Sequence, residues 1–334
     1  MKSGYLSKIV NSNLLLGSGF ILLTTATLLD LLLPRDVRAV HSLPSNEILI
    51  SLSIGGITIG ELLSKPFVQN IFQFLFILLA GALVQYMASE NRIIRVRSNF
   101  PFFLSCLLIA SILPLIPFDG AFLSNIFLLL SCVRLLSIQE SSHVRRVIFD
   151  ATLLLIVASI FQPRLLFLLP VFWFVMVLMQ TMTFRNFLAS LVGLFTTFWL
   201  LIGVLALLGK FSFILMYLNE TVDFQLFDIQ LLSIPETIYL GFMAILVVSA
   251  LISFWPRQHL DKLKTRNSIN SVLAIWFGLL VIWLFSSNDL GILLHLMTLS
   301  SVLIAHFFSL VDTWYSRVLF VLLLVLTVVV FLLY

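Results

Sequence analysis

Charged residues are scarce in this chain. Asp, Glu, Lys and Arg make up 10% of its 334 residues, whereas a soluble globular protein carries about 25%. Hydrophobic residues make up 61% of the chain, and its mean hydropathy is +1.15. These values exclude a soluble domain of any size and indicate a chain that lies mostly in lipid. The sequence therefore predicts an all-α, polytopic transmembrane helix bundle that forms a single domain over residues 1–334.

Cysteine is almost absent, and the common nucleotide and metal motifs are missing. Cys106 and Cys132 both fall inside predicted membrane spans, where they suggest neither a disulfide framework nor a metal site. No Walker loop, dinucleotide-binding glycine pattern, His-Glu-x-x-His or Gly-x-Ser-x-Gly occurs. Because the Lys and Arg residues are scattered over short loops, nucleic-acid binding is not expected. We expect no cofactor, and the bilayer is the first expected partner.

Long apolar runs with very short polar breaks fill the rest of the chain. Residues 149–199 show the pattern best, since Gln162-Pro163-Arg164 and Thr183-Phe184-Arg185-Asn186 alone separate three apolar segments. About 20 apolar residues are needed to cross a bilayer as a helix. About eleven spans are predicted: 14–33, 67–88, 100–118, 121–137, 147–161, 165–182, 187–208, 237–254, 271–285, 290–310 and 317–334. Pro114 is expected to kink its span.

Two segments are predicted not to cross the membrane. Residues 47–61 hold 13 uncharged residues between Glu47 and Glu61, too few for a span, and their strand-like alternation predicts a short outer piece. Residues 209–236 mix acidic and apolar side chains and are expected to pack on the membrane surface. Counting 47–61 as a span leaves the charge balance between the two sides unchanged, so length alone decides between these alternatives.

The basic residues predict the orientation. With the N-terminus inside, fourteen of the 19 Lys and Arg residues fall in cytoplasmic loops, which satisfies the positive-inside rule. Most acidic residues then fall outside, so the outer face is the expected functional face. We read 14–33 as a retained first span and not as a cleaved signal peptide.

The central third of the chain, about residues 122–200, contains four distinctive stretches: Arg134, Phe149-Asp150-Ala151, Ala158-Ser159-Ile160-Phe161 and Phe184-Arg185-Asn186. On these residues it resembles a family of uncharacterised inner-membrane proteins of the Bacteroidota. The resemblance implies a multi-span helical protein in the inner (plasma) membrane of a Gram-negative cell envelope. It implies no particular activity.

A second resemblance is to the C-type membrane glycosyltransferases. The run from Ala158 to Arg164 is similar to their pattern of small residues, x-Arg-Pro and an apolar span, although here the order is Pro-Arg. Such enzymes use polyprenyl-phosphate sugars and place a catalytic Asp in their first outer loop. In this chain, Asp30 and Asp36 stand at the matching positions.

Four charged residues form a possible active site on that interpretation. Asp36 is a candidate general base, while Arg35, Arg38 and Arg164 are candidates to bind a substrate phosphate bidentately. The alternative is structural. Charges at span ends pair with one another, and a lone Arg164 extends to the lipid headgroups.

Two further pairs admit a structural and a functional interpretation. Arg134 and Asp150 lie near the inner ends of adjacent spans and are predicted to form a structural ion pair. His295 and His306 share a helix face, which fits either hydrogen bonds to neighbouring spans or a proton relay.

The sequence leaves three functions open and does not decide whether the protein is an enzyme. The first is a non-catalytic membrane subunit that scaffolds an envelope complex with other membrane proteins. The second is a glycosyltransferase or glycan polymerase that uses polyprenyl-linked sugar at the periplasmic face. The third is a proton-coupled transporter.

Overall fold

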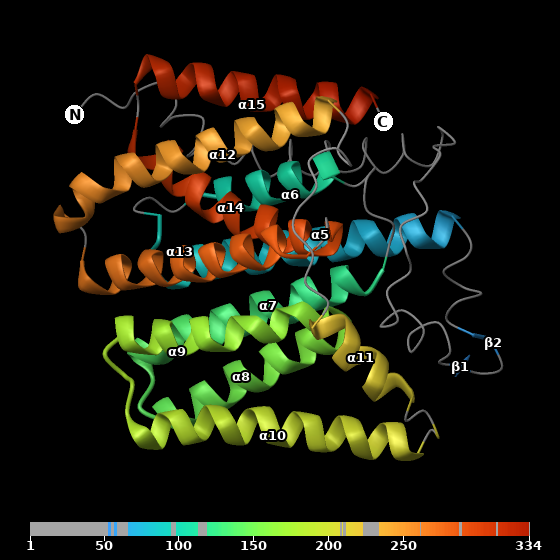
Figure 1. Cartoon of the computed structure of the whole chain (residues 1–334). Helices are drawn as coiled ribbons and strands as arrows, with labels where there is room; N and C mark the ends of the chain where they lie inside the picture. Colours follow the sequence, from blue (N-terminus) through green and yellow to red (C-terminus); the bar gives the residue numbers. More distant parts are fainter. Residues whose placement is uncertain are drawn as a thin grey trace.

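The structure is a computed structural model, in which helices make up almost all of the described residues (Figure 1). It describes residues 53–54, 57–58, 66–94, 98–112, 119–207, 209, 212–222, 234–260, 262–286, 289–311 and 313–333. The α-helices are α5 (Pro66–Glu90), α6 (Phe100–Ile112), α7 (Gly120–Leu136), α8 (Val144–Phe161), α9 (Leu169–Leu178), α10 (Phe184–Leu207), α11 (Ser212–Val222), α12 (Ile234–Phe254), α13 (Leu263–Leu284), α14 (Leu290–Leu310) and α15 (Trp314–Leu333). The 3₁₀ helices are η2 (Ser137–Glu140), η3 (Pro163–Leu168) and η5 (Trp255–Leu260).

Within the described ranges, six helices are long and apolar enough to cross a membrane. They are 68–90, 120–139, 184–207, 237–254, 263–284 and 290–310. Three more apolar helices, 100–112, 163–178 and 314–330, are shorter. The chain is thus an integral membrane protein with several spans, while the predicted total of about eleven is not confirmed. The predicted first span, 14–33, lies outside the described residues.

Most predicted helices are found close to their predicted bounds, with two clear corrections. The predicted span 271–285 begins too late, because α13 already starts at Leu263 and includes Lys264 and Arg266 in its first turn. The predicted span 165–182 is not one long helix, because it consists of η3 followed by the ten-residue α9. Pro163 and Pro170 each stand in the first turn of these two helices, where a missing N–H costs nothing. α9 ends because Gln180 takes φ 58°, and the Thr181 N–H then bonds back to the Met176 carbonyl. Pro114, with its predicted kink, lies outside the described residues.

The two segments that are predicted not to cross the membrane contain short elements of secondary structure. Within 47–61, β1 (Ser53–Ile54) pairs antiparallel with β2 (Ile57–Thr58). Most of the residues with the predicted strand-like alternation lie outside the described residues. Within 209–236 lies the 11-residue α11, which buries Phe213 and Tyr217 in a small cluster with Leu205 of α10. The Tyr217 hydroxyl lies 3.1 Å from the Ser159 hydroxyl of α8.

α14 is the central helix of the bundle. All 18 residues from Gly291 to Phe308 are buried, so this helix faces protein on every side. Polar side chains bind it to its neighbours: Trp276 Nε1 of α13 donates to Ser300 Oγ at 2.8 Å, and Asn125 Nδ2 of α7 donates to Thr298 Oγ1 at 3.1 Å. Because lipid supplies little hydrophobic drive between helices, such hydrogen bonds and close packing decide which helices associate.

Ser124 forms one of these interhelical contacts, with His295 Nε2 of α14 at 2.6 Å. We expect Ser124→Ala to destabilise the protein by about 1 kcal/mol, because it leaves a buried ring nitrogen without its partner. The measurement is the denaturant midpoint in mixed micelles. Ser249→Ala is the control, because this exposed hydroxyl bonds only within α12. Equal, negligible shifts in both variants would contradict the prediction.

α10 packs on α8 through a stripe of small and polar residues. Its buried residues include Asn186, Ser190, Gly193 and Thr197, spaced along one helical face. A Cβ at Gly193 would lie 3.0 Å from the Phe149 carbonyl oxygen of α8, so glycine allows this close approach without displacing the α8 backbone. The opposite face of α10 exposes large apolar side chains such as Phe195 and Trp199, as expected of a lipid-facing surface.

Candidate functional site

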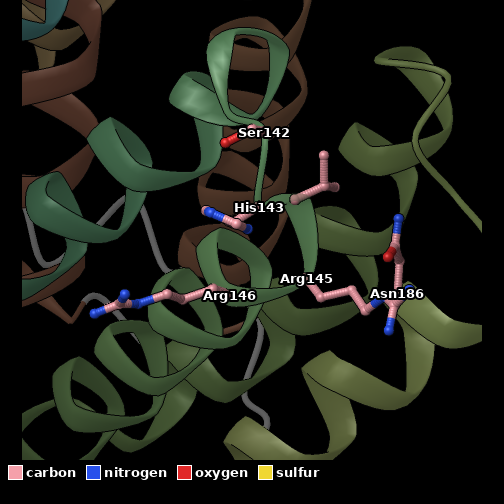
Figure 2. A pocket seen from close by; sticks show the side chains of 6 residues that line it. Ser142, His143, Arg145, Arg146 and Asn186 are labelled. Atoms are coloured by element: carbon pink, nitrogen blue, oxygen red, sulfur yellow. The ribbon is translucent and has the colours of Figure 1, made fainter.

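A basic groove lies where α8 and α10 begin. It has a volume of about 610 Å³ and is lined by Ser142, His143, Val144, Arg145, Arg146 and Asn186. In Figure 2, the side chains of Arg145 and Asn186 extend toward one another, and Arg146 extends in the opposite direction. We call this site the basic groove.

The local sequence explains how the start of α8 comes to line the groove. The Ser141 hydroxyl accepts from the His143 N–H at 3.0 Å, which turns the chain into α8. His143 is the N-cap of α8, but its side chain makes no capping hydrogen bond. The first turn of α8 thus points N–H groups and the positive end of the helix dipole at the groove.

α10 adds a second helix N-terminus beside the first. Asn186 lies in its first turn and is held in place, since its Nδ2 donates to the Thr181 carbonyl at 2.6 Å. Arg185, the neighbouring residue, is exposed and contributes another positive charge close by. Two helix N-termini with several guanidinium groups form a site that attracts anions, and phosphate above all.

The groove borders an apolar surface. Phe184, directly before Arg185, is 75% exposed, and Met182 is also exposed. Exposed aromatic and basic residues at the end of a helix bundle are typical of the level of the lipid headgroups. A ligand bound here is therefore expected to lie at the boundary between membrane and water.

The predicted substrate-binding residue Arg164 lies at the opposite end of α8, in η3. Its Nη1 donates to Asp289 Oδ2 at 3.0 Å and to the Ser286 carbonyl at 2.8 Å. The two charged side chains are 10% and 7% exposed. This group is thus already engaged in a buried ion pair that links η3 to the start of α14, and its role in binding substrate stays a prediction.

The predicted pair of Arg134 and Asp150 lies on two helices that pack together, but the two described side chains form no ion pair. α7 and α8 pack together, with the Ser131 hydroxyl donating to the Ala151 carbonyl at 2.6 Å. Arg134 is exposed and Asp150 is half-buried, and in the described part of the chain no ion pair connects them. Their pairing stays a prediction.

Both histidines of α14 are hydrogen-bonded to neighbouring segments. His295 Nδ1 lies 2.7 Å from the Gly291 carbonyl, which can only accept, so Nδ1 carries a proton. His295 Nε2 lies 2.6 Å from the Ser124 hydroxyl of α7, which also contacts the Ala121 carbonyl at 3.0 Å. His306 Nδ1 lies 2.7 Å from the Ile93 carbonyl, in the chain between α5 and α6. These contacts bear out the structural interpretation of the two histidines.

The remaining predicted site residues are Asp30, Asp36, Arg35 and Arg38, and all four lie outside the described residues. In the described ranges, no group of three or more His, Cys, Asp or Glu side chains could hold a metal ion. The basic groove itself was missed as a site, although the sequence signal was present in the run His143-Val144-Arg145-Arg146.

Comparison with known proteins gives no match. No family model, no curated protein and no solved structure is significantly similar to this chain.

Proposed function

We propose that this membrane protein is a non-catalytic subunit that binds phosphate-bearing lipid headgroups in the basic groove. The observation that carries the proposal is the groove of about 610 Å³ at the starts of α8 and α10, which Arg145 and Arg146 line and in which Arg145 extends toward Asn186 (Figure 2). Guanidinium groups bind phosphate oxygens bidentately, and helix N-termini add N–H donors. The exposed Phe184 next to the groove favours a lipid over a soluble phosphate.

The packing of the bundle supports a scaffold more than a transport path. α14 is buried on every side from Gly291 to Phe308. Between α12, α13 and α14, beside His306, the described side chains leave a cavity of about 10 Å³. This volume holds about one water molecule.

The basic groove also bears on the enzyme hypothesis. A polyprenyl-linked sugar carries phosphate, so the groove suits the headgroup of such a lipid. The predicted orientation, however, places the groove on the cytoplasmic side, whereas the predicted transferase acts at the periplasmic face. Scaffolding through a phospholipid therefore accounts for the groove more simply, and an inner-membrane setting in a Gram-negative envelope remains part of the proposal.

We expect Arg145→Ala/Arg146→Ala to lose most bound anionic lipid, by tenfold or more in affinity, because each lost phosphate contact by arginine is worth about 1.5–3 kcal/mol. The measurement is native mass spectrometry of the purified protein with added phosphatidylglycerol, compared with phosphatidylcholine and with inorganic phosphate. The matched control is Arg134→Ala/Lys262→Ala, which removes the same charge from exposed residues outside the groove.

Three outcomes decide the proposal. Selective loss of phosphatidylglycerol in the groove variant alone supports it. Equal loss in both double variants would mean that net charge attracts the lipid and would contradict a built site. Retention of inorganic phosphate with no preference for phosphatidylglycerol would replace the lipid by a soluble anion and would also overturn the proposal.

A further inference from the structure

Two carboxylates cap neighbouring helices at the end of the bundle opposite the basic groove. Asp119 Oδ1 accepts from the Ala121 N–H at 2.8 Å and begins α7. Asp289 Oδ1 accepts from the Gly291 N–H at 2.9 Å and begins α14. Each carboxylate thus satisfies one of the free N–H groups at a helix N-terminus.

The two caps converge at Gly291. A Cβ added there would lie 3.0 Å from Ala121 Cβ, 3.1 Å from Asp289 Oδ1 and 3.1 Å from Gln162 Oε1. The space beside Gly291 is therefore bordered by the first turn of α7, the cap of α14 and the amide oxygen at the end of α8. We call Asp119, Gln162, Arg164 and Asp289 the acid cap cluster.

Among the described residues, the cluster holds two carboxylates and one guanidinium. The Arg164 guanidinium bonds to Asp289, and the carboxylate of Asp119 is close enough to Asp289 for the two charges to interact. The titratable neighbour on α14 is His295, whose two ring nitrogens are both engaged in hydrogen bonds. Gln162 of α8 and Ser286 after α13 are uncharged. With both carboxylates ionised, the described groups carry one net negative charge, although the Asp289 side chain is only 7% exposed and Asp119 is half-buried. Removing such a charge from water without a partner is costly.

Gln162 adds a second, independent observation. The residue is 1% exposed, and its Nε2 donates to Asp289 Oδ2. Its Oε1 is buried and has no hydrogen-bond partner in the described part of the chain. A buried acceptor oxygen without a donor is uncommon in proteins, and it calls for a missing proton or ion.

We propose that the acid cap cluster binds one positive charge, a proton or Na⁺, among Asp119, Asp289 and Gln162. A bound proton converts the Asp119 carboxylate into a neutral carboxyl group, which removes the excess negative charge and supplies an O–H donor. Na⁺ would neutralise the same charge when coordinated by carboxylate and amide oxygens, which are the ligands that hard cations prefer. The proposal is independent of the basic groove.

The pKa shifts of Asp119 and Asp289 are consistent with proton uptake by the cluster. Burial raises the pKa of Asp119 to about 7, the Ala121 N–H opposes this shift, and the charge of Asp289 adds to it. Burial also raises the pKa of Asp289, against the lowering effect of Arg164. A pKa of about 7 allows Asp119 to exchange a proton near neutral pH.

The raised pKa of Asp119 determines whether the folded state gains or loses stability as pH increases. Because the pKa of Asp119 is higher in the folded protein than the ordinary value of 3.8, the folded state holds the proton more tightly than the unfolded state. In choline chloride, the unfolding equilibrium constant of the wild type should rise as pH increases, by up to about tenfold per unit between about pH 4 and 7, and then level off. Stability is therefore lost as pH rises through about 7.

The first experiment compares the wild type with Asp119→Asn, since asparagine keeps the cap without the charge. We expect the pH dependence to become flatter in this variant and to persist in Asp150→Asn, a half-buried acid near the other end of α8. Replacing choline by Na⁺ at pH 8 separates the two cations. Restored stability in the wild type, absent from Asp119→Asn, assigns Na⁺, and no restoration assigns the proton. The same pH dependence in wild type and Asp119→Asn would overturn the proposal.

A second measurement needs no substitution. Dicyclohexylcarbodiimide reacts with protonated, poorly hydrated carboxyl groups, and mass spectrometry locates the adduct. Labelling of Asp119 in the whole protein should increase several-fold as pH falls from 8 to 6, and bound Na⁺ should suppress it. Absence of labelling at every pH, with or without Na⁺, would contradict a site that exchanges its cation.

Discussion

Asp289→Asn is expected to destabilise the protein by about 3–5 kcal/mol, because it removes the carboxylate to which the largely buried Arg164 guanidinium bonds at 3.0 Å. Asparagine keeps an oxygen to cap α14, so the loss reports on the ion pair and not on the cap. Arg164→Met should cost a similar amount, since it leaves the Asp289 carboxylate buried beside Asp119. The measurement is the free energy of unfolding in mixed micelles.

The double variant Arg164→Met/Asp289→Asn is the matched control. It removes both charges together, and we expect it to be more stable than either single variant, because no unpaired charge remains. Losses that simply add in the double variant would show that the two residues act independently. This result would contradict the role of the pair in joining η3 to α14.

Gly193→Leu is expected to cost about 1–3 kcal/mol or more, because a side chain there meets the Phe149 carbonyl oxygen of α8 at 3.0 Å. The two helices must then separate where they pack most closely. Since α8 and α10 supply opposite sides of the basic groove, the affinity for phosphatidylglycerol should fall as well. Thermal unfolding and lipid retention are measured on the same sample.

Gly203→Leu provides the comparison within the same helix. No atom lies within 4 Å of a Cβ at Gly203, so a leucine there extends away from the bundle. It should leave both stability and lipid binding close to those of the wild type. Equal losses at the two positions would show that the helix tolerates no larger residue anywhere and would remove the packing argument.

Hydropathy predicted the bounds of several described helices closely. The span predicted at 290–310 coincides with α14, and 121–137 differs from α7 by one residue at each end. Hydropathy succeeds because every backbone group in lipid must bond within its own helix. It failed at 165–182, because Pro163 and Pro170 begin two successive short helices, and hydropathy does not register such a break.

The candidate sites depended on contacts that no local pattern specifies. Arg164 looked like a lone basic residue in a short turn, yet it bonds to Asp289, 125 residues further along the chain. His295 and Ser124 meet over 171 residues. Span-by-span reasoning treats each helix separately, and so it cannot identify which polar groups face one another.

The sequence by itself determined that this protein lies in a membrane and where most of its described helices begin and end, because lipid selects for apolar helices of sufficient length. Only the tertiary structure decided that α14 is the buried centre, that Arg164 pairs with Asp289, and that the starts of α8 and α10 form a basic groove. The physical reason is that burial in lipid is a property of single segments, whereas charge pairing and close packing are properties of pairs of helices.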